Sequence, residues 1–389
     1  MTTSDLEKDR SIFKSFWMGG FESSTHINRY GTRLDLIAFT QHDEQVQVDY
    51  ALLRAMGLSV VRDAARWHLI EKTPGKFDFS SFLPMIKAAR LHQVQVIWDI
   101  CHYGFPNDID LLSPSFVTRF SNYAAALAQV VKDQSPDIPF YCPFNEISFY
   151  SWAAGEEGWI HPFYRKRGAD VKQQLVRSCI AAVNAIWEVD PRARIVYVDP
   201  IIHVHPPADK PELANDAIRY TESQYEALDM FLGRAHPELG GDPRYLDIIG
   251  VNFYHSNQWE HGVGRLRWED EPRDSRWIPL HKMLETIYRR YERPLFIAET
   301  SHVGVGRARW MNEIGAEVLL AFEAGVPLQG VCLYPIIDRP DWEDDTHWHN
   351  SGLWDYAREN GKFIRVLNSE YEEALRNAQL QVYDYLRQR

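Results

Sequence analysis

The chain has 389 residues, of which 45% are hydrophobic and 25% are charged, and its formal net charge is −12. This mixture excludes an intrinsically disordered chain, and the acidic balance argues against nucleic acid as a partner, because nucleic-acid surfaces need clustered basic residues. No run of about eighteen apolar residues occurs, so we expect no membrane span.

The N-terminal stretch MTTSDLEKDR is polar and charged, with no apolar segment behind it, and so does not resemble a secretory signal. The four cysteines form no CxxC pair, and three of them lie in or at the end of apolar runs; they are Cys101, Cys142, Cys179 and Cys332. We interpret them as reduced thiols of the core, which indicates a cytoplasmic protein.

Short apolar runs typical of strands alternate along the chain with patterns of helical spacing. The expected strands are residues 16–21, 58–61, 94–101, 140–144, 194–199, 246–253, 295–298 and 328–334. The expected helices are residues 44–56, 80–91, 113–131, 171–189, 212–232, 279–291, 309–324 and 370–386. Ser113 is a candidate N-cap for the third of these helices, with Pro114 at its first position.

Eight apolar strands, each followed by a helix, predict an α/β protein with a (β/α)8 TIM barrel. Such barrels run long as single domains, so we expect one catalytic domain over residues 1–389, with residues 1–14 as an N-terminal extension. The structural rival is a doubly wound sheet, which usually carries a glycine-rich phosphate loop after its first strand. Here Gly19-Gly20 is followed by FESSTH, which lacks that spacing.

The expected strand ends are rich in polar and aromatic residues. In a barrel, function resides on the loops that follow the carboxyl ends of the strands. These positions carry Glu22, Ser24, His26, Arg62, Arg66, Trp67, His102, Tyr103, Asn145, Glu146, His203, His205, Asn252, Tyr254, His255, Glu299, Asp338, Asp341 and Trp342. A ring of such residues on one face indicates a functional site.

Two glutamates in this ring suggest an acid/base pair. Glu146 follows the fourth strand and Glu299 the seventh, on opposite sides of the barrel. Two such carboxylates can hydrolyse a glycosidic bond, and the retaining route needs them about 5–5.5 Å apart. The acid needs a raised pKa, from burial or from the second charge, and a nearby arginine such as Arg62 favours the ionised nucleophile.

Three motifs around these residues resemble glycoside hydrolase family 1, the retaining β-glycosidases. PFNEI at residues 143–147 is similar to T-F-N-E-P, FIAETS at 296–301 to I-T-E-N-G, and VRDAARW from Val61 to Y-R-F-S-I-S-W. The resemblance implies that Glu146 is the acid/base, that Asn145 binds the sugar 2-hydroxyl and that Glu299 is the nucleophile. It also places Arg62 beside that nucleophile.

The other motifs of this resemblance concern the sugar. ICHYGFP implies His102 as a sugar ligand, and IIGVNFYHS implies that Tyr254 hydrogen-bonds the nucleophile, with Asn252 beside the sugar. GGFESSTHI and YPIIDRPDW carry the expected terminal-sugar residues, which are His26, Tyr334, Asp341 and Trp342. His26, Tyr334 and Asp341 differ from the family's glutamine, tryptophan and glutamate, and this leaves the sugar's identity open. The resemblance implies no metal and no cofactor.

The leading hypothesis is therefore an exo-acting retaining β-glycosidase with a carbohydrate substrate. Transglycosylation at the same site is a near alternative. A metal-dependent hydrolase on the same barrel is another, using the pairs His203-x-His205 and His347-x-His349. A carbohydrate-binding protein with an inactive site is a third, against which both glutamates argue. No feature of the sequence points to a particular linkage or oligomeric state.

Overall fold

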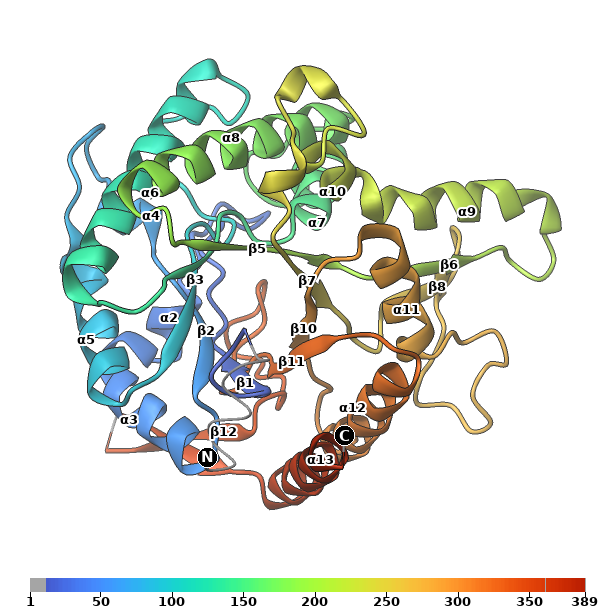
Figure 1. Cartoon of the computed structure of the whole chain (residues 1–389). Helices are drawn as coiled ribbons and strands as arrows, with labels where there is room; N and C mark the ends of the chain where they lie inside the picture. The colour runs from blue at the N-terminus through green and yellow to red at the C-terminus, as the bar shows by residue number, and fades with distance from the viewer. Residues whose placement is uncertain (1–11, 361, 389) are drawn as a thin grey trace.

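A closed barrel of eight parallel strands forms the centre of the molecule (Figure 1). The computed structural model describes residues 12–360 and 362–388. The barrel strands are β1 (Trp17–Gly20), β2 (Val60–Ala64), β3 (Gln95–Asp99), β4 (Phe140–Cys142), β5 (Arg194–Pro200), β7 (Ile248–Asn252), β10 (Leu295–Thr300) and β11 (Leu328–Leu333). They follow one another around the barrel in chain order, and β11 pairs with β1 to close it. The predicted (β/α)8 barrel is confirmed.

The helices form an outer ring around these strands (Figure 1). They are α3 (His42–Ala55), α5 (Leu83–Leu91), α6 (Pro114–Gln134), α8 (Gly168–Val189), α9 (Ala214–Glu222), α10 (Glu226–Phe231), α11 (Leu280–Tyr291), α12 (Gly306–Glu323) and α13 (Ser369–Arg387). Ser113 occupies the N-cap position of α6, with proline following, but its hydroxyl bonds the Asp110 carbonyl and the Ser115 hydroxyl rather than a backbone N–H of the helix. No helix of the described residues is long and apolar enough to cross a membrane.

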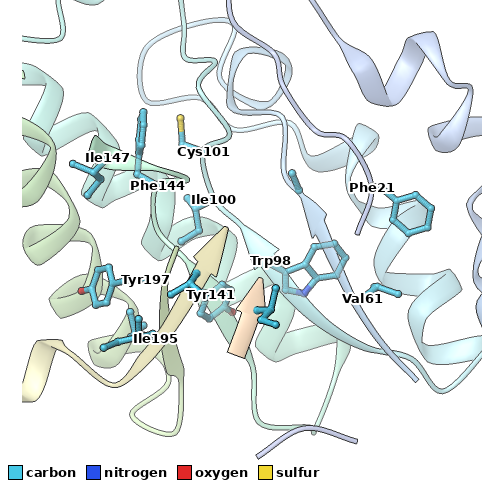
Figure 2. Close-up of a cluster of buried hydrophobic side chains, with 14 of the residues drawn as sticks. Phe21, Val61, Trp98, Ile100, Cys101, Tyr141, Phe144, Ile147, Ile195 and Tyr197 are labelled. Carbon is cyan, nitrogen blue, oxygen red and sulfur yellow. The ribbon is translucent and has the colours of Figure 1, made fainter. Parts of the chain in front are cut away.

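Alternating side chains of the strands fill two cores. On β3 and β4, Ile97 and Phe140 belong to the cluster inside the barrel. The alternate residues Trp98 and Tyr141 belong to the larger cluster between the strands and the helices (Figure 2). This period of two is the pleat of a strand whose two faces are both buried. Phe13 packs on Phe140 and on the β10 residue Phe296, with ring centroids 5.4 and 5.2 Å away. Phe13, in the predicted N-terminal extension, therefore packs at the amino-terminal end of the barrel. Residues 1–11 of this extension lie outside the described part of the chain.

Two strands extend further than their apolar runs predict. Arg62 and Asp63 lie inside β2, and Glu299 lies inside β10, although we expected Arg62 and Glu299 to follow their strands. A strand tolerates buried charges when partners satisfy them. Asp63 accepts hydrogen bonds from Tyr50 at 2.6 Å and lies 2.9 Å from a ring nitrogen of His42. Because the charged side chains near its end are paired, the strand can continue beyond its apolar residues.

The helix predicted over residues 212–232 is interrupted. A turn at Ser223–Tyr225 separates α9 from α10. In this turn the Gln224 amide accepts from the backbone N–H of Ile202 at 2.9 Å and donates to its carbonyl at 3.1 Å. These tertiary hydrogen bonds end α9 at a point where the helical spacing of the sequence predicts that the helix continues.

Several short elements had no signal in the sequence. A small sheet contains β6 (His203–His205), β8 (Gln258–Glu260) and β9 (Gly264–Arg265), and it projects beside α9 from the barrel (Figure 1). A hairpin of β12 (Trp354–Glu359) and β13 (Lys362–Leu367) follows β11. The short helices are α2 (Leu36–Phe39), α4 (Trp67–Ile70), α7 (Ile147–Tyr150) and a π-helical turn at Ser151–Glu156. The helices of four residues span about one turn, which is too little to display a helical periodicity.

Candidate active site

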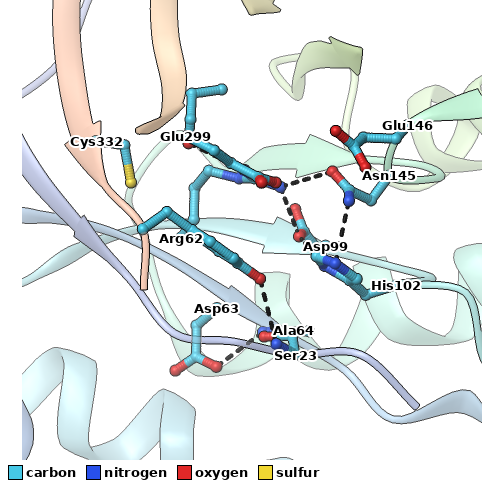
Figure 3. A network of polar contacts seen from close by, with 12 residues as sticks. Ser23, Arg62, Asp63, Ala64, Asp99, His102, Asn145, Glu146, Glu299 and Cys332 are labelled. Atoms are coloured by element: carbon cyan, nitrogen blue, oxygen red, sulfur yellow. Dashed lines mark hydrogen bonds and ion pairs between the residues drawn. The ribbon is translucent and has the colours of Figure 1, made fainter. Parts of the chain in front are cut away.

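Arg62 is the centre of a buried polar network at the carboxyl ends of the strands (Figure 3). Its side chain is 0% exposed. Nη1 donates to Glu299 Oε1 at 2.9 Å and to the carbonyl of Ala298 at 3.0 Å. Nη2 donates to Asp99 Oδ2 at 2.7 Å and to Asn145 Oδ1 at 3.0 Å. One guanidinium thereby joins β2, β3, β10 and the segment after β4.

Glu299 is held from two sides. Besides the Arg62 guanidinium at Oε1, the Tyr254 hydroxyl donates to Oε2 at 2.7 Å. Burial raises the pKa of Tyr254 well above its ordinary value, so the hydroxyl keeps its proton and remains a donor. Both carboxylate oxygens are therefore positioned, and the carboxylate lies against a permanent positive charge.

Glu146 has a different environment. Asn252 Nδ2 donates to Oε1 at 2.7 Å, and the Tyr103 hydroxyl donates to Oε2. Burial, and then the negative charge of Glu299, raise the pKa of Glu146 to about 8, against the smaller effect of these two hydrogen bonds. Near neutral pH this carboxyl group holds a proton that it can donate.

The backbone at Glu146 is also unusual. This residue precedes α7 in the left-handed region, at φ 48° and ψ 63°. For a residue with a Cβ this conformation costs on the order of 1–3 kcal/mol and persists only where surrounding contacts impose it. Here the Glu146 N–H donates to the Val198 carbonyl at 2.9 Å, and the Glu146 carbonyl accepts from the N–H of Tyr150 at 2.8 Å. These bonds turn the chain sharply and present the carboxyl group over the barrel.

Asp99, His102 and Asn145 form the third part of the network. Asp99 Oδ2 lies 3.0 Å from His102 Nδ1, which places the ring proton there, and His102 Nε2 then accepts from Asn145 Nδ2 at 3.0 Å. The pKa of Asp99 is lowered because Arg62 and His102 outweigh the opposing effect of burial. This chain fixes the orientation of both His102 and Asn145. We call these nine residues the carboxylate network: Arg62, Asp99, His102, Tyr103, Asn145, Glu146, Asn252, Tyr254 and Glu299.

Three expected sugar ligands border the carboxylate network. The Tyr334 ring lies parallel to His102, with centroids 6.1 Å apart and 8° between planes, and Arg62 lies 5.3 Å from its centroid. His26 meets Trp342 edge-on, with centroids 4.6 Å apart. Both ring nitrogens of His26 and the indole nitrogen of Trp342 are buried without a hydrogen-bond partner among residues 12–360 and 362–388. Burial lowers the pKa of His26 to about 3, so the ring is neutral.

Asp341, the fourth expected sugar ligand, is hydrogen-bonded within its own loop. Its Oδ1 accepts from the backbone N–H of Glu343 at 2.8 Å, and its Oδ2 lies 3.0 Å from His349 Nε2. These bonds tie the carboxylate to its own loop, and its side chain remains 34% exposed. Glu22 is the buried carboxylate here, 3.3 Å from the Arg339 guanidinium. The pKa of Glu22 is lowered because the Arg339 charge and the hydrogen bonds from Ser24 act against the effect of burial.

Sequence reasoning missed two members of the carboxylate network as site residues. Asp99 stands alone as a charge within the apolar run VQVIWDIC, and that interruption was the available signal. Tyr103 was noted at a strand end, but its bond to Glu146 was not foreseen. Tyr103 has a φ of 70°, so the backbone turns tightly at this residue and sets the direction of its hydroxyl. No sequence pattern predicts this conformation.

The paired histidines considered as metal ligands stand apart from the carboxylate network. His203 and His205 lie on β6 with ring centroids 4.5 Å apart, and His349 is bonded to Asp341. Among residues 12–360 and 362–388, three close side chains that can hold a metal ion are found elsewhere, at His255, Glu269 and His302.

Solved structures share this architecture along nearly the whole chain. A family 1 β-glucosidase from Thermotoga maritima matches with a TM-score of 0.75 at 15% identity, covering 96% of this chain and 99% of that one. A β-glycosidase from Pyrococcus horikoshii matches with a TM-score of 0.75 at 18% identity, covering 96% of both chains. The AHE enzyme from Alicyclobacillus herbarius has a TM-score of 0.76 at 15% identity, covering 95% and 99%.

At such identities the likeness establishes the fold: the chain has the (β/α)8 barrel of these β-glycosidases. A scan against protein-family models finds no match, and a comparison with curated proteins finds none either.

Proposed function

We propose that this protein is a retaining β-glycosidase of the glycoside hydrolase family 1 type, with Glu146 as the acid/base and Glu299 as the nucleophile. The observation that carries the proposal is the asymmetry of the two buried carboxyl groups. Glu299 is paired with the Arg62 guanidinium, whereas Glu146 has neutral partners and a pKa raised to about 8. Two carboxyl groups in opposed environments define the acid and base assignments of a glycosidase.

The reaction proceeds by two displacements. Glu299 attacks the anomeric carbon while Glu146 donates its proton to the departing glycosidic oxygen, and a covalent glycosyl–enzyme results. Glu146, now ionised, takes a proton from a water molecule, which attacks the same carbon and releases Glu299. Tyr254 holds the attacking carboxylate in place through Oε2. The positive charge of Arg62 balances the negative charge of Glu299 before the substrate reacts.

The substrate is a carbohydrate whose terminal sugar lies between the two glutamates. His102 and Asn145 have fixed orientations that suit hydroxyl recognition, and the unpaired nitrogens of His26 and Trp342 provide further polar contacts. The T. maritima β-glucosidase has been solved in complex with castanospermine and with deoxynojirimycin, which is consistent with a carbohydrate substrate for a chain of the same fold. We assign hydrolysis rather than binding alone because both carboxyl groups are present and held.

We also propose a cytoplasmic enzyme that acts as one barrel domain. All four cysteines are buried free thiols, which supports a reducing compartment. Strands from both halves of the chain contribute to one carboxylate network, which supports a single catalytic unit.

The decisive experiment combines a variant with a covalent trap. Glu299→Gln should lower the rate of aryl β-glycoside cleavage by more than about 10³-fold, because it removes the nucleophile. A 2-fluoro glycoside with a good leaving group should label the parent at Glu299, as read by mass spectrometry of peptides. Glu71→Gln is the matched control, since Glu71 is equally buried but bonds Trp67 and Gly75 instead.

Undiminished cleavage by the Glu299→Gln variant, or labelling at another residue, would overturn the assignment. Full labelling of a Glu146→Gln variant with the same activated substrate is expected, because a good leaving group needs no proton from the acid.

A further inference from the structure

Three side chains outside the carboxylate network converge from separate segments. His255 follows β7, His302 follows β10, and Glu269 lies in the connection between β9 and α11. Each can offer one metal-ligating atom, and these atoms lie within 4.8 Å of one another. None of the three bonds to Glu146 or Glu299, so the cluster has no part in the proposed double displacement.

The spacing suits a metal ion. His302 Nε2 lies 3.4 Å from Glu269 Oε1, and the His255 and His302 rings have centroids 4.3 Å apart. A tetrahedral zinc ion with bonds of about 2.0–2.1 Å holds its ligand atoms about 3.3 Å apart.

Among the residues that the structure describes, each of these three has a buried polar atom without a hydrogen-bond partner, although His302 Nε2 lies 3.4 Å from Glu269 Oε1. These atoms are His255 Nδ1, Glu269 Oε2 and His302 Nε2. Most buried polar atoms in folded proteins have partners, so three orphans in one small space point to a missing one. An ion that accepts lone pairs satisfies two imidazole nitrogens and a carboxylate oxygen at once.

His302 is pre-oriented as a ligand. Its side chain is 5% exposed, and its Nδ1 lies 2.9 Å from the carbonyl of Val303. That bond places the proton on Nδ1 and leaves the Nε2 lone pair directed at the cluster, which is the usual arrangement behind a metal-bound histidine. A Cβ at Gly306 would lie 2.3 Å from the same Nδ1, so only glycine leaves room for the ring. Trp268 packs on the ring with centroids 5.0 Å apart.

The local charges select the kind of ion. Arg265 lies 3.2 Å from Glu269 Oε1, the same oxygen that faces His302 Nε2, while Oε2 is buried and has no hydrogen-bond partner among the described residues. Two imidazoles and one carboxylate are the donor set of zinc and its neighbours among the transition metals, whereas calcium and magnesium prefer oxygen.

We propose that His255, Glu269 and His302 form a binding site for one divalent transition-metal ion, with zinc the best match to the donors. The ion links the segments that follow β7 and β10 to the connection between β9 and α11. Tyr254, which donates to Glu299, directly precedes His255, so the ion braces the segment that carries this tyrosine. The fourth coordination position belongs to water.

Metal binding is measured directly, without reference to glycosidase activity. Protein freed of metal by a chelator is titrated with Zn²⁺ in a calorimeter and with Co²⁺ in a spectrophotometer. The parent should bind one ion per chain, with visible Co²⁺ bands typical of tetrahedral coordination and a rise in unfolding temperature on adding Zn²⁺. Glu269→Gln and His255→Ala should each weaken binding by at least about 10-fold.

The matched control is His205→Ala, which removes a histidine of the β6 pair and should leave the Zn²⁺ affinity unchanged. Circular dichroism of each metal-free variant verifies that it is folded; both ligand variants alter half-buried side chains. The absence of saturable binding by the parent, or equal affinity in the Glu269→Gln variant, would overturn the proposal. Either result would leave the double displacement at Glu146 and Glu299 untouched, because that reaction is tested by covalent labelling.

Discussion

Arg62 and Glu299 meet at 2.9 Å across 237 residues of chain, and both side chains are buried. The pairing joins β2 to β10 inside the barrel, with Asp99 and Asn145 bonded to the other terminal nitrogen of the same guanidinium. A planar donor fork that serves four acceptors leaves little freedom to any of them. The position of the proposed nucleophile therefore depends on an arginine rather than on its own strand alone.

Arg62→Lys tests this dependence. One ammonium group cannot span four acceptors, so the buried acids lose partners, and we expect a loss of about 3–5 kcal/mol in the free energy of unfolding. We expect kcat/KM to fall by at least about 10²-fold, measured on an aryl β-glycoside. Arg365→Lys is the control, because Arg365 is a buried arginine paired with Asp49 away from the site. It should lose stability and keep its kcat/KM; the same kinetic loss in both variants would contradict this account.

The hydroxyl of Tyr103 should tune the alkaline limit of activity. Its hydrogen bond lowers the pKa of Glu146, which burial and Glu299 raise to about 8. Glu146 must be protonated to act as the acid, so kcat/KM of the parent should decline as the pH passes about 8. Tyr103→Phe removes the hydrogen bond and should move this decline to higher pH in the pH–rate profile. Tyr123→Phe, which removes a hydroxyl bonded to the Ile100 carbonyl, should leave the limit in place; a downward shift in Tyr103→Phe would count against Glu146 as the acid.

Glu146 should also cost stability at high pH. The folded-state pKa of about 8 exceeds the ordinary value of 4.5, so between these values the unfolded chain releases a proton that the folded chain retains. Stability contributed by this group is thus complete below about pH 4.5 and is lost as the pH rises through about 8.

Glu146→Gln cannot ionise, so its advantage in urea-unfolding free energy over the parent should grow between pH 5 and pH 9, by more than about 1 kcal/mol. Glu238→Gln provides the comparison, because the pKa of this exposed glutamate is lowered, chiefly by a backbone hydrogen bond, and its effect should stay constant over that range. An advantage of Glu146→Gln that is flat with pH would refute the raised pKa.

His26 should bind substrate without titrating. Its two ring nitrogens are buried without hydrogen-bond partners in the described part of the chain, and burial lowers its pKa to about 3, which keeps the ring neutral at working pH. His26→Phe retains the packing on Trp342 but removes both polar atoms, so we expect KM to rise about 10-fold with a smaller change in kcat. The rise should be the same at pH 5 and pH 8. His92→Phe is the control: His92 caps the carboxyl end of α5, and this variant should leave KM unchanged. An equal rise in KM in the His26→Phe and His92→Phe variants would show that His26 does not contact the sugar.

The sequence by itself determined the barrel and singled out the two carboxyl groups that we propose as catalytic. Eight apolar runs buried on both faces, separated by helical spacing, admit few architectures, because each run must be covered on two sides. Glu146 and Glu299 stand out because a charge at the end of an apolar run needs a task or a partner. Local pattern and burial were sufficient for these predictions.

Only the tertiary structure decided which side chains those carboxyl groups meet. Tyr103 bonds Glu146, Asp99 serves both Arg62 and His102, and Asp341 turns to its own loop. The cluster of His255, Glu269 and His302 likewise forms from three segments with no common motif. Such contacts depend on which loops lie close together once the barrel has closed. The periodicity of the sequence contains no information about the distances between those loops.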